Sequence, residues 1–319
     1  MPDQSLIKTE MAPGTMDLGL SRLKLFLALS RTPHGLLDLA APALAALLYL
    51  GHLPPLGVTA LGLLTVFAGY TAVYALNDVV DYRVDQEKLR LQRPKEGHYL
   101  DAVFMRHPLA AGRVSFPEGL GWTAVWALVA LLGAYALNPV CALIFLGGCL
   151  LEAAYCLLLK VSQLRLLVAG VVKSLGALAA VLAVAPKPSP IFLAILFLWL
   201  FFWEMGGQNI PADWHDVEQD RSLEAKTIPV VLGLQRAAAL ALVSLTCSLA
   251  FSVVILRLAP VPFSLFPQLL ISGAGIYLLL LPAWRLFRGQ TQNQAADLFN
   301  RASYYPLTVL AVVLINFFI

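Results

Sequence analysis

Nine long apolar stretches constrain the fold of this chain more than any other feature. Each is close to the roughly 20 residues that a helix needs to cross the hydrocarbon core of a bilayer. They lie at 33–52, 56–77, 118–136, 139–159, 165–185, 190–211, 237–257, 264–286 and 302–319. Hydrophobic residues make up 59% of the 319 residues and charged residues only 13%, about half the usual fraction of a soluble domain. The sequence therefore predicts an all-α integral membrane protein with about nine transmembrane helices.

The basic residues predict the orientation of these helices. If the N-terminus is cytoplasmic, nineteen Lys and Arg residues fall on the cytoplasmic side and only Lys187 and Arg257 on the other, with Lys173 inside a span. Such an imbalance is typical of multi-pass proteins, whose cytoplasmic loops are rich in Lys and Arg. We expect a plasma- or inner-membrane protein with a cytoplasmic N-terminus.

The domain organisation is simple. Residues 1–19 are polar to mixed and are predicted to form a flexible tail, because they lack the apolar core of a cleavable signal. Residues 20–31 are predicted to form an amphipathic interfacial helix, and residues 20–319 a single membrane domain. All four cysteines lie in apolar spans without metal-ligand spacing, which indicates small buried side chains.

A pattern of three aspartates occurs twice, each time at the end of an apolar stretch. Both copies read D-x-x-D-x-x-x-D: Asp78, Asp81 and Asp85 in the first motif, and Asp213, Asp216 and Asp220 in the second motif. On a continuous helix these steps would place the three carboxylates on one face. Carboxylates gathered in one cleft need cations between them, and oxygen ligands suit Mg²⁺ that is shared with a phosphate-bearing substrate. The orientation predicted above places both motifs on the cytoplasmic face.

Four charged residues lie inside the predicted spans, away from the span ends: Asp38, Glu152, Lys173 and Glu204. Charges inside a membrane are costly and usually functional. They leave open the alternative of a transporter with an ion path. Transporters carry their key charges near the middle of the membrane in broken helices, whereas the densest carboxylates here lie at helix ends on one face. The pattern therefore favours an enzyme.

The motifs resemble those of the UbiA superfamily of intramembrane prenyltransferases. Asn77 and the first motif are similar to the family's N-D-x-x-D-x-x-x-D. Residues 106–115 (RHPLAAGRVS) are similar to R-P-L-x-x-G-x-I-S with one extra residue, and 155–160 (YCLLLK) resembles Y-x-x-x-L-K. Residues 216–221 (DVEQDR) followed by 226–229 (KTIP) resemble D-x-E-x-D-R…K-T-x-P. Two departures are a longer stretch at 86–105 and a second motif without the tyrosine that is typical of 4-hydroxybenzoate enzymes.

The resemblance implies a helical bundle around a central cavity that takes a polyprenyl diphosphate. Breaking the allylic C–O bond leaves negative charge on the diphosphate, which Mg²⁺ and basic side chains would stabilise. The expected metal ligands are Asn77, Asp78, Asp81, Asp85, Asp213, Asp216 and Asp220, the six aspartates being also the expected catalytic residues. The expected substrate-binding residues are Asn77, Arg106, Tyr155, Lys160, Lys173, Asn209 and Lys226.

The acceptor of the prenyl group is the least determined part of this prediction. An aromatic or other hydrophobic acceptor on the route to a quinone is the leading interpretation. The alternatives are a glycerol-phosphate lipid, a porphyrin, or the prenyl chain itself in a cyclisation. Membrane lipid is the expected environment, and the sequence indicates no nucleic-acid partner.

Overall fold

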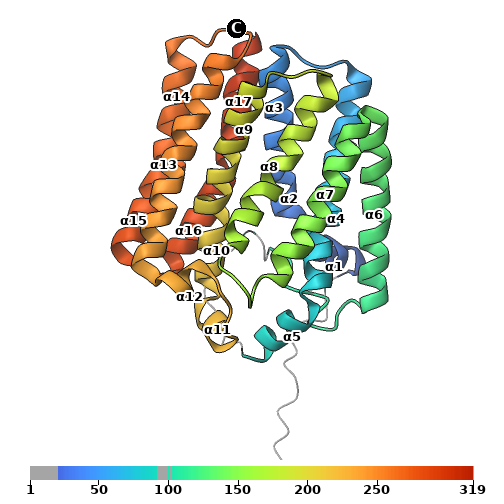
Figure 1. The fold of residues 1–319 in the computed structure, drawn as a ribbon, viewed down its shortest axis with the longest axis vertical. Helices are drawn as coiled ribbons and strands as arrows, with labels where there is room; N and C mark the ends of the chain where they lie inside the picture. The colour runs from blue at the N-terminus through green and yellow to red at the C-terminus, as the bar shows by residue number, and fades with distance from the viewer. Residues whose placement is uncertain (1–20, 92–99, 101–102, 319) are drawn as a thin grey trace, which may run out of the picture.

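The computed structural model describes residues 21–91, 100 and 103–318. Within these residues all regular secondary structure is helical, and nine helical segments are long and apolar enough to cross a membrane. Figure 1 shows them side by side as one bundle. The predicted fold class is confirmed. The predicted tail at 1–19 lies outside the described residues, as does most of 92–102 in the longer stretch.

The first five spans form the N-terminal part of the bundle. They consist of α2 (Thr32–Asp38) with α3 (Ala40–Leu50), α4 (Leu56–Val80), α6 (Phe116–Leu137), α7 (Pro139–Leu157) and α8 (Arg165–Val184). Local capping sets some of these ends. Ser115 and Glu118 form a reciprocal capping box that starts α6, and the Asn138 side chain accepts a hydrogen bond from Val140 N–H at the start of α7.

The other four spans include two with a π-helical segment. They consist of α9 (Pro190–Trp203), η2 (Glu204–Asn209) and α10 (Ile210–His215); α13 (Leu234–Leu258); α14 (Leu265–Gly275), η3 (Ile276–Leu280) and α15 (Leu281–Gly289); and α16 (Gln292–Ser303) with α17 (Tyr305–Phe318). The last span begins about ten residues before the predicted 302 because α16 has polar residues on one face only. Its other face, with Leu298 and Phe299, is buried.

Four short helices gather at one end of the bundle, called the motif end below (Figure 1). They are α1 (Arg22–Leu29), α5 (Tyr82–Arg90), α11 (Val217–Ser222) and α12 (Ile228–Leu232). The C-terminus lies at the opposite end. Helix α1 confirms the helix predicted at 20–31: Arg22 and Lys24 are exposed, whereas Leu25 and Leu29 pack with Leu109. Its position in the membrane interface stays a prediction.

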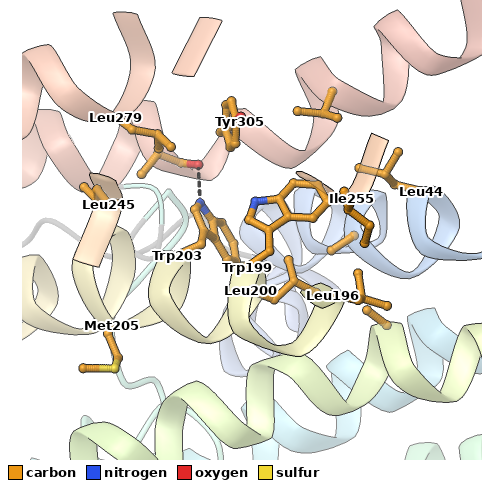
Figure 2. Packing of buried hydrophobic residues seen from close by; sticks show 14 of the residues in the cluster. Leu44, Leu196, Trp199, Leu200, Trp203, Met205, Leu245, Ile255, Leu279 and Tyr305 are labelled. Atoms are coloured by element: carbon orange, nitrogen blue, oxygen red, sulfur yellow. Dashed lines mark hydrogen bonds between the residues drawn. The ribbon is translucent and has the colours of Figure 1, made fainter. Parts of the chain in front are cut away.

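A large apolar core fills the C-terminal part of the bundle. Trp199 and Trp203 on α9 are each 1% exposed and lie among leucines of neighbouring helices (Figure 2). Trp203 Nε1 donates a hydrogen bond of 3.0 Å to the backbone oxygen of Ala302, which satisfies the indole N–H inside an apolar environment. The core therefore fixes α9, and with it the π-helical segment and α10 that follow.

Candidate active site

A cavity of about 480 Å³ lies among the spans of the N-terminal part and the segment η2–α10. Most of its wall is apolar, with Val66, Ile144 and Phe145 among the lining side chains. Five motif carboxylates also line it: Asp78, Asp81, Asp85, Asp213 and Asp216. Asp220, the sixth, is fully buried outside this lining. The fold thus brings the two motifs, about 135 residues apart in the chain, to one apolar cavity.

Each motif straddles a break between two helices, which corrects the prediction of one continuous helical face. Helix α4 ends at Val80 and α5 begins at Tyr82, so Asp81 stands at the junction. Asp216 has the same place between α10 and α11, with φ −102° and ψ 8°. The first aspartate of each motif therefore belongs to a membrane span and the third to a short helix of the motif end.

Cationic side chains from distant segments contact the first motif. Arg31 donates hydrogen bonds to Asn77 Oδ1 at 3.0 Å and to Asp78 Oδ1 at 3.3 Å. His107 Nδ1 lies 2.8 Å from Asp85 Oδ2 and 3.4 Å from Asp78 Oδ1. These contacts compensate carboxylates that are almost fully buried, since Asp78 is 2% exposed and Asp85 5%.

The second motif has its own cations. Arg165, the first residue of α8, lies 3.3 Å from Asp213 Oδ1. Arg106 forms a bidentate ion pair with Asp216, in which its two terminal nitrogens donate to Oδ1 at 2.8 Å and to Oδ2 at 2.6 Å. Lys88 Nζ lies 2.8 Å from Asp220 and 3.7 Å from Asp216.

Two neighbouring residues connect the motifs. Arg106 contacts the second motif, and His107, next in the chain, contacts the first. His107 has a φ of 50° and Arg31 a φ of 45°, a left-handed conformation that is uncommon for residues with a side chain. Local strain of this kind is characteristic of functional sites. Here it accompanies two side chains that reach the carboxylates of the first motif.

Burial and charge shift the pKa values at the motif end. Burial raises the pKa of Asp81, and the neighbouring carboxylate of Asp85 raises it further. Burial disfavours the charged form of His107, but the carboxylates of Asp85 and Asp78 outweigh this effect and raise its pKa to about 9. Burial likewise opposes the charge of Lys88, yet Asp216 and Asp220 raise its pKa. Both side chains are therefore cations at neutral pH.

Amides and a tyrosine support the carboxylates. Asn77 donates to Glu152 Oε1 at 2.7 Å, which directs its side-chain oxygen toward Arg31. Asn209, the last residue of η2, donates to the hydroxyl of Tyr155 at 2.8 Å. The guanidinium of Arg165 lies 4.0 Å from the centre of the Tyr155 ring, a cation–π contact.

A second charged cluster, called the inner cluster below, lies along the same cavity. Lys173 Nζ donates to Asp38 Oδ2 at 2.6 Å and to the Tyr74 hydroxyl at 3.2 Å. Tyr74 also donates to Asp38. Glu204, the first residue of η2, has its Oε2 4.0 Å from Lys173 Nζ. These four residues define the inner cluster.

Two expected substrate-binding residues lie outside the cavity lining. Lys160 is about half exposed and pairs with Glu87 at 3.1 Å. The exposed Lys226 is anchored by its backbone N–H, which donates to Leu159 O at 2.6 Å. The structure brings Asn77, Arg106, Tyr155, Lys173 and Asn209 to the cavity with the five carboxylates.

Four side chains of the site were not among the expected residues: Arg31, Lys88, His107 and Arg165. All are basic, and the sequence places each in or beside a loop, where such residues are expected as determinants of topology. The extra residue in 106–115 was the only local signal, because it is His107 itself.

The residues present fit a divalent cation with oxygen ligands. Asp78 and Asp85 each place a carboxylate oxygen within 4.8 Å of the other, and the protonated His107 contacts both, so this position already holds a positive charge. Asn209 Oδ1 is buried without a hydrogen-bond partner among the described residues. Carboxylate and amide oxygens are the ligands that Mg²⁺ prefers, and basic side chains nearby suit the phosphate oxygens that share such an ion.

Comparison with known proteins agrees with this chemistry. Residues 39–305 match the model of the UbiA prenyltransferase family. A curated relative, the digeranylgeranylglyceryl phosphate synthase of Thermococcus sibiricus, is 26% identical over 278 residues, which are 86% of this chain and 90% of the relative.

Solved structures share the fold. A UbiA homologue from Aeropyrum pernix K1 has a TM-score of 0.70 at 19% identity, with 89% of this chain and 98% of that one covered. A homologue from Archaeoglobus fulgidus bound to DMAPP and Mg²⁺ has a TM-score of 0.64 at 19% identity, covering 91% and 99%. The chain belongs to the UbiA prenyltransferase family, and it is an integral membrane enzyme of the prenyltransferase class.

Proposed function

We propose that this protein transfers a prenyl group from a polyprenyl diphosphate to a hydrophobic acceptor in a reaction that depends on Mg²⁺. One observation carries the proposal: two aspartate motifs and five basic residues converge at a cavity whose remaining wall is mostly apolar. The charged part suits a diphosphate with its metal, and the apolar part suits an isoprenoid chain.

The structure supports specific roles for the motif residues. Asn77, Asn209 and the five aspartates that line the cavity would supply oxygen atoms for Mg²⁺, which when bound would stabilise the negative charge of the leaving diphosphate. Asp220, the sixth aspartate, is buried behind them and holds Lys88 beside Asp216. Arg31, Lys88, Arg106 and Arg165 hold positive charge beside the same carboxylates and are placed to contact diphosphate oxygens. Tyr155 orients Asn209 and Arg165. Lys160 and Lys226 lie outside the cavity lining, so for them contact with the substrate is proposed only as it enters.

Relatives support the donor and the metal. The Archaeoglobus fulgidus homologue has been solved with DMAPP and Mg²⁺ and also with GPP and Mg²⁺. Both ligands carry an allylic prenyl diphosphate. The same donor class and the same ion are therefore proposed for this chain.

Two acceptor classes are proposed for direct comparison. An aromatic acceptor, as in quinone biosynthesis, is the interpretation that the sequence favoured. A glycerol-phosphate lipid is favoured by the similarity to the synthase of Thermococcus sibiricus, whose identity extends over most of both chains. Both acceptors present a nucleophile to the same allylic carbon, so the donor site described above serves either.

The motif end is proposed to face the cytoplasm. The support is the distribution of Lys and Arg: with this orientation, nineteen lie on the cytoplasmic side and two on the other side. Reactivity of cysteines introduced at either end toward an impermeant reagent in intact cells tests it.

Release of diphosphate tests the function. Purified protein in lipid receives geranylgeranyl diphosphate with Mg²⁺ or with a chelator, together with 4-hydroxybenzoate, 1,4-dihydroxy-2-naphthoate, homogentisate or geranylgeranylglyceryl phosphate. We expect Mg²⁺-dependent release that rises with one acceptor class. Release unaffected by every acceptor would indicate a cyclase, and folded protein that releases nothing from any donor would refute prenyl transfer.

A further inference from the structure

The roles proposed above assign no residue to one step of the reaction, the removal of a proton from the acceptor. When an acceptor attacks the allylic carbon, its attacking atom carries a proton that must be removed. The motif carboxylates are engaged by Arg31, Lys88, Arg106, His107 and Arg165 and are the expected ligands of the metal. A proton acceptor elsewhere on the cavity wall would leave these contacts intact.

The inner cluster has the right position. Tyr74 lies on α4 one helical turn before Asn77 and Asp78, about 5 Å deeper along the helix axis. The guanidinium of Arg31 bridges the two levels, since it contacts Asp78 and lies 5.6 Å from the centre of the Tyr74 ring. The inner cluster thus forms the next layer of the cavity, beside the place where the prenyl chain leaves the diphosphate site.

Within the inner cluster, the carboxylates differ in their contacts. Asp38 is 3% exposed and bonded by both Lys173 and Tyr74, and it does not belong to the cavity lining. Glu204 does line the cavity. Its Oε2 has no hydrogen-bond partner among the described residues and only the longer contact of 4.0 Å with Lys173.

The backbone at Glu204 departs from a regular α-helix. Glu204 opens the π-helical segment η2, which ends at Asn209, another lining residue. A π-helical turn inserts one residue into a helix and is often found at functional sites. Gly206 and Gly207 allow close packing there: a Cβ on Gly206 would lie 2.7 Å from the Ala241 backbone oxygen.

We propose that Glu204 is the catalytic base that takes the proton from the acceptor, with Lys173 and Asp38 as positioning residues. The inference rests on the proposed function. The allylic C–O bond of the donor breaks, and its electron pair leaves with the diphosphate. An electron pair of the acceptor forms the bond to the allylic carbon. The proton on the attacking oxygen or ring carbon passes to the Glu204 carboxylate, which later returns it to water.

The charges around Glu204 agree with this role. Lys173 is bonded to Asp38 at 2.6 Å, so its charge is largely compensated there, and only the longer contact of 4.0 Å links it to Glu204. Lys173 also lies 5.4 Å from the centre of the Trp203 ring and 5.6 Å from that of Tyr70. These contacts hold the ammonium of Lys173 beside the Glu204 carboxylate.

The test compares Glu204→Gln, which keeps the shape of the side chain, with Glu204→Asp, which keeps the acid. A positioned base contributes about 100-fold or more to rate. We expect Glu204→Gln to lower kcat by about 100-fold for transfer to the acceptor that raises diphosphate release. The kcat of Glu204→Asp should be at least about tenfold higher than that of Glu204→Gln. The Mg²⁺-dependent affinity for geranylgeranyl diphosphate, measured by competition with a fluorescent donor analogue, is expected to change less than about twofold, because a base acts after donor binding.

Asp297→Asn is the matched control, since it makes the same acid-to-amide change on α16 in a pair with Arg301 that lies outside the cavity lining. Wild-type kcat in Glu204→Gln overturns the inference and leaves the proposed function intact. So does a loss of donor affinity as large as the loss of rate, because it would assign Glu204 to the donor site. Wild-type protein that never releases diphosphate overturns the proposed function and this inference with it.

Discussion

The pair of Arg165 and Asp213 gives the most quantitative test of how the site is built. Arg165 begins α8 and Asp213 lies in α10, and their side chains are 6% and 11% exposed. At 3.3 Å, two unit charges interact by about 5 kcal/mol for an effective dielectric constant of about 20. Removing one partner of such a buried pair costs about 3–5 kcal/mol, because the other charge is left without compensation.

Arg165→Met removes the guanidinium and keeps much of the side-chain volume. We expect the free energy of unfolding in detergent with chelator present to fall by about 3–4 kcal/mol. Asp213→Asn alone should cost less, since Arg165 keeps its contact with the Tyr155 ring, which is worth up to about 2 kcal/mol when desolvated. Denaturant titration followed by tryptophan fluorescence measures both.

The double variant decides whether the pair itself is responsible. Arg165→Met with Asp213→Asn removes both charges, so its loss should be smaller than the sum of the two single losses by about 2–3 kcal/mol. A loss in the double variant that equals the sum of the two single losses to within about 0.5 kcal/mol would refute the pairing. Arg236→Met, the same change at an exposed position at the start of α13, is the control and should stay within about 0.5 kcal/mol of wild type.

Three further predictions concern activity. Asp78→Ala or Asp216→Ala should lower turnover by at least about 100-fold while the protein remains folded, because metal stabilisation of the leaving group supplies several kcal/mol; near-normal turnover in both variants would contradict the metal site. A chelator should abolish diphosphate release, with recovery on adding Mg²⁺; release that persists would exclude a metal requirement. Gly62, about 22 Å along α4 from Asn77, lines the cavity in open space, so Gly62→Phe should impair a geranylgeranyl donor more than a geranyl donor in parallel rate measurements. Equal effects on both donors would show that the chain does not reach this depth.

Much of the fold was predictable because its causes are local. Apolar segments of bilayer length must form helices, so hydropathy locates the spans. The exception is the start of the last span. A hydropathy average treats 292–301 as polar, although Leu298 and Phe299 on one face are buried. Hydropathy over a window does not record the face on which a residue lies.

The site was predictable only in part, for a related reason. The aspartates form a local motif, so the sequence shows them directly. Arg31 and Arg165 reach them from other helices, across separations of 47 and 48 residues, and nothing in their local sequence distinguishes them from topology determinants. The break at Asp81 and the π-helical segment beginning at Glu204 were missed as well, because both arise from packing between helices.

The two arginine–aspartate contacts extend the similarity of the two motifs to the helices that precede them. Arg31 stands just before the first span and pairs with the first aspartate at the end of the second span; Arg165 opens the fifth span and pairs with its counterpart at the end of the sixth. Each guanidinium also faces a tyrosine ring. The arginine–aspartate arrangement therefore occurs in two pairs of helices, whereas the tyrosines differ in position, because Tyr74 lies on the second span and Tyr155 on the fourth. The proposed base Glu204 and its neighbour Lys173 have no counterpart in the first pair of helices, so the two halves of the site differ in the layer below the motifs.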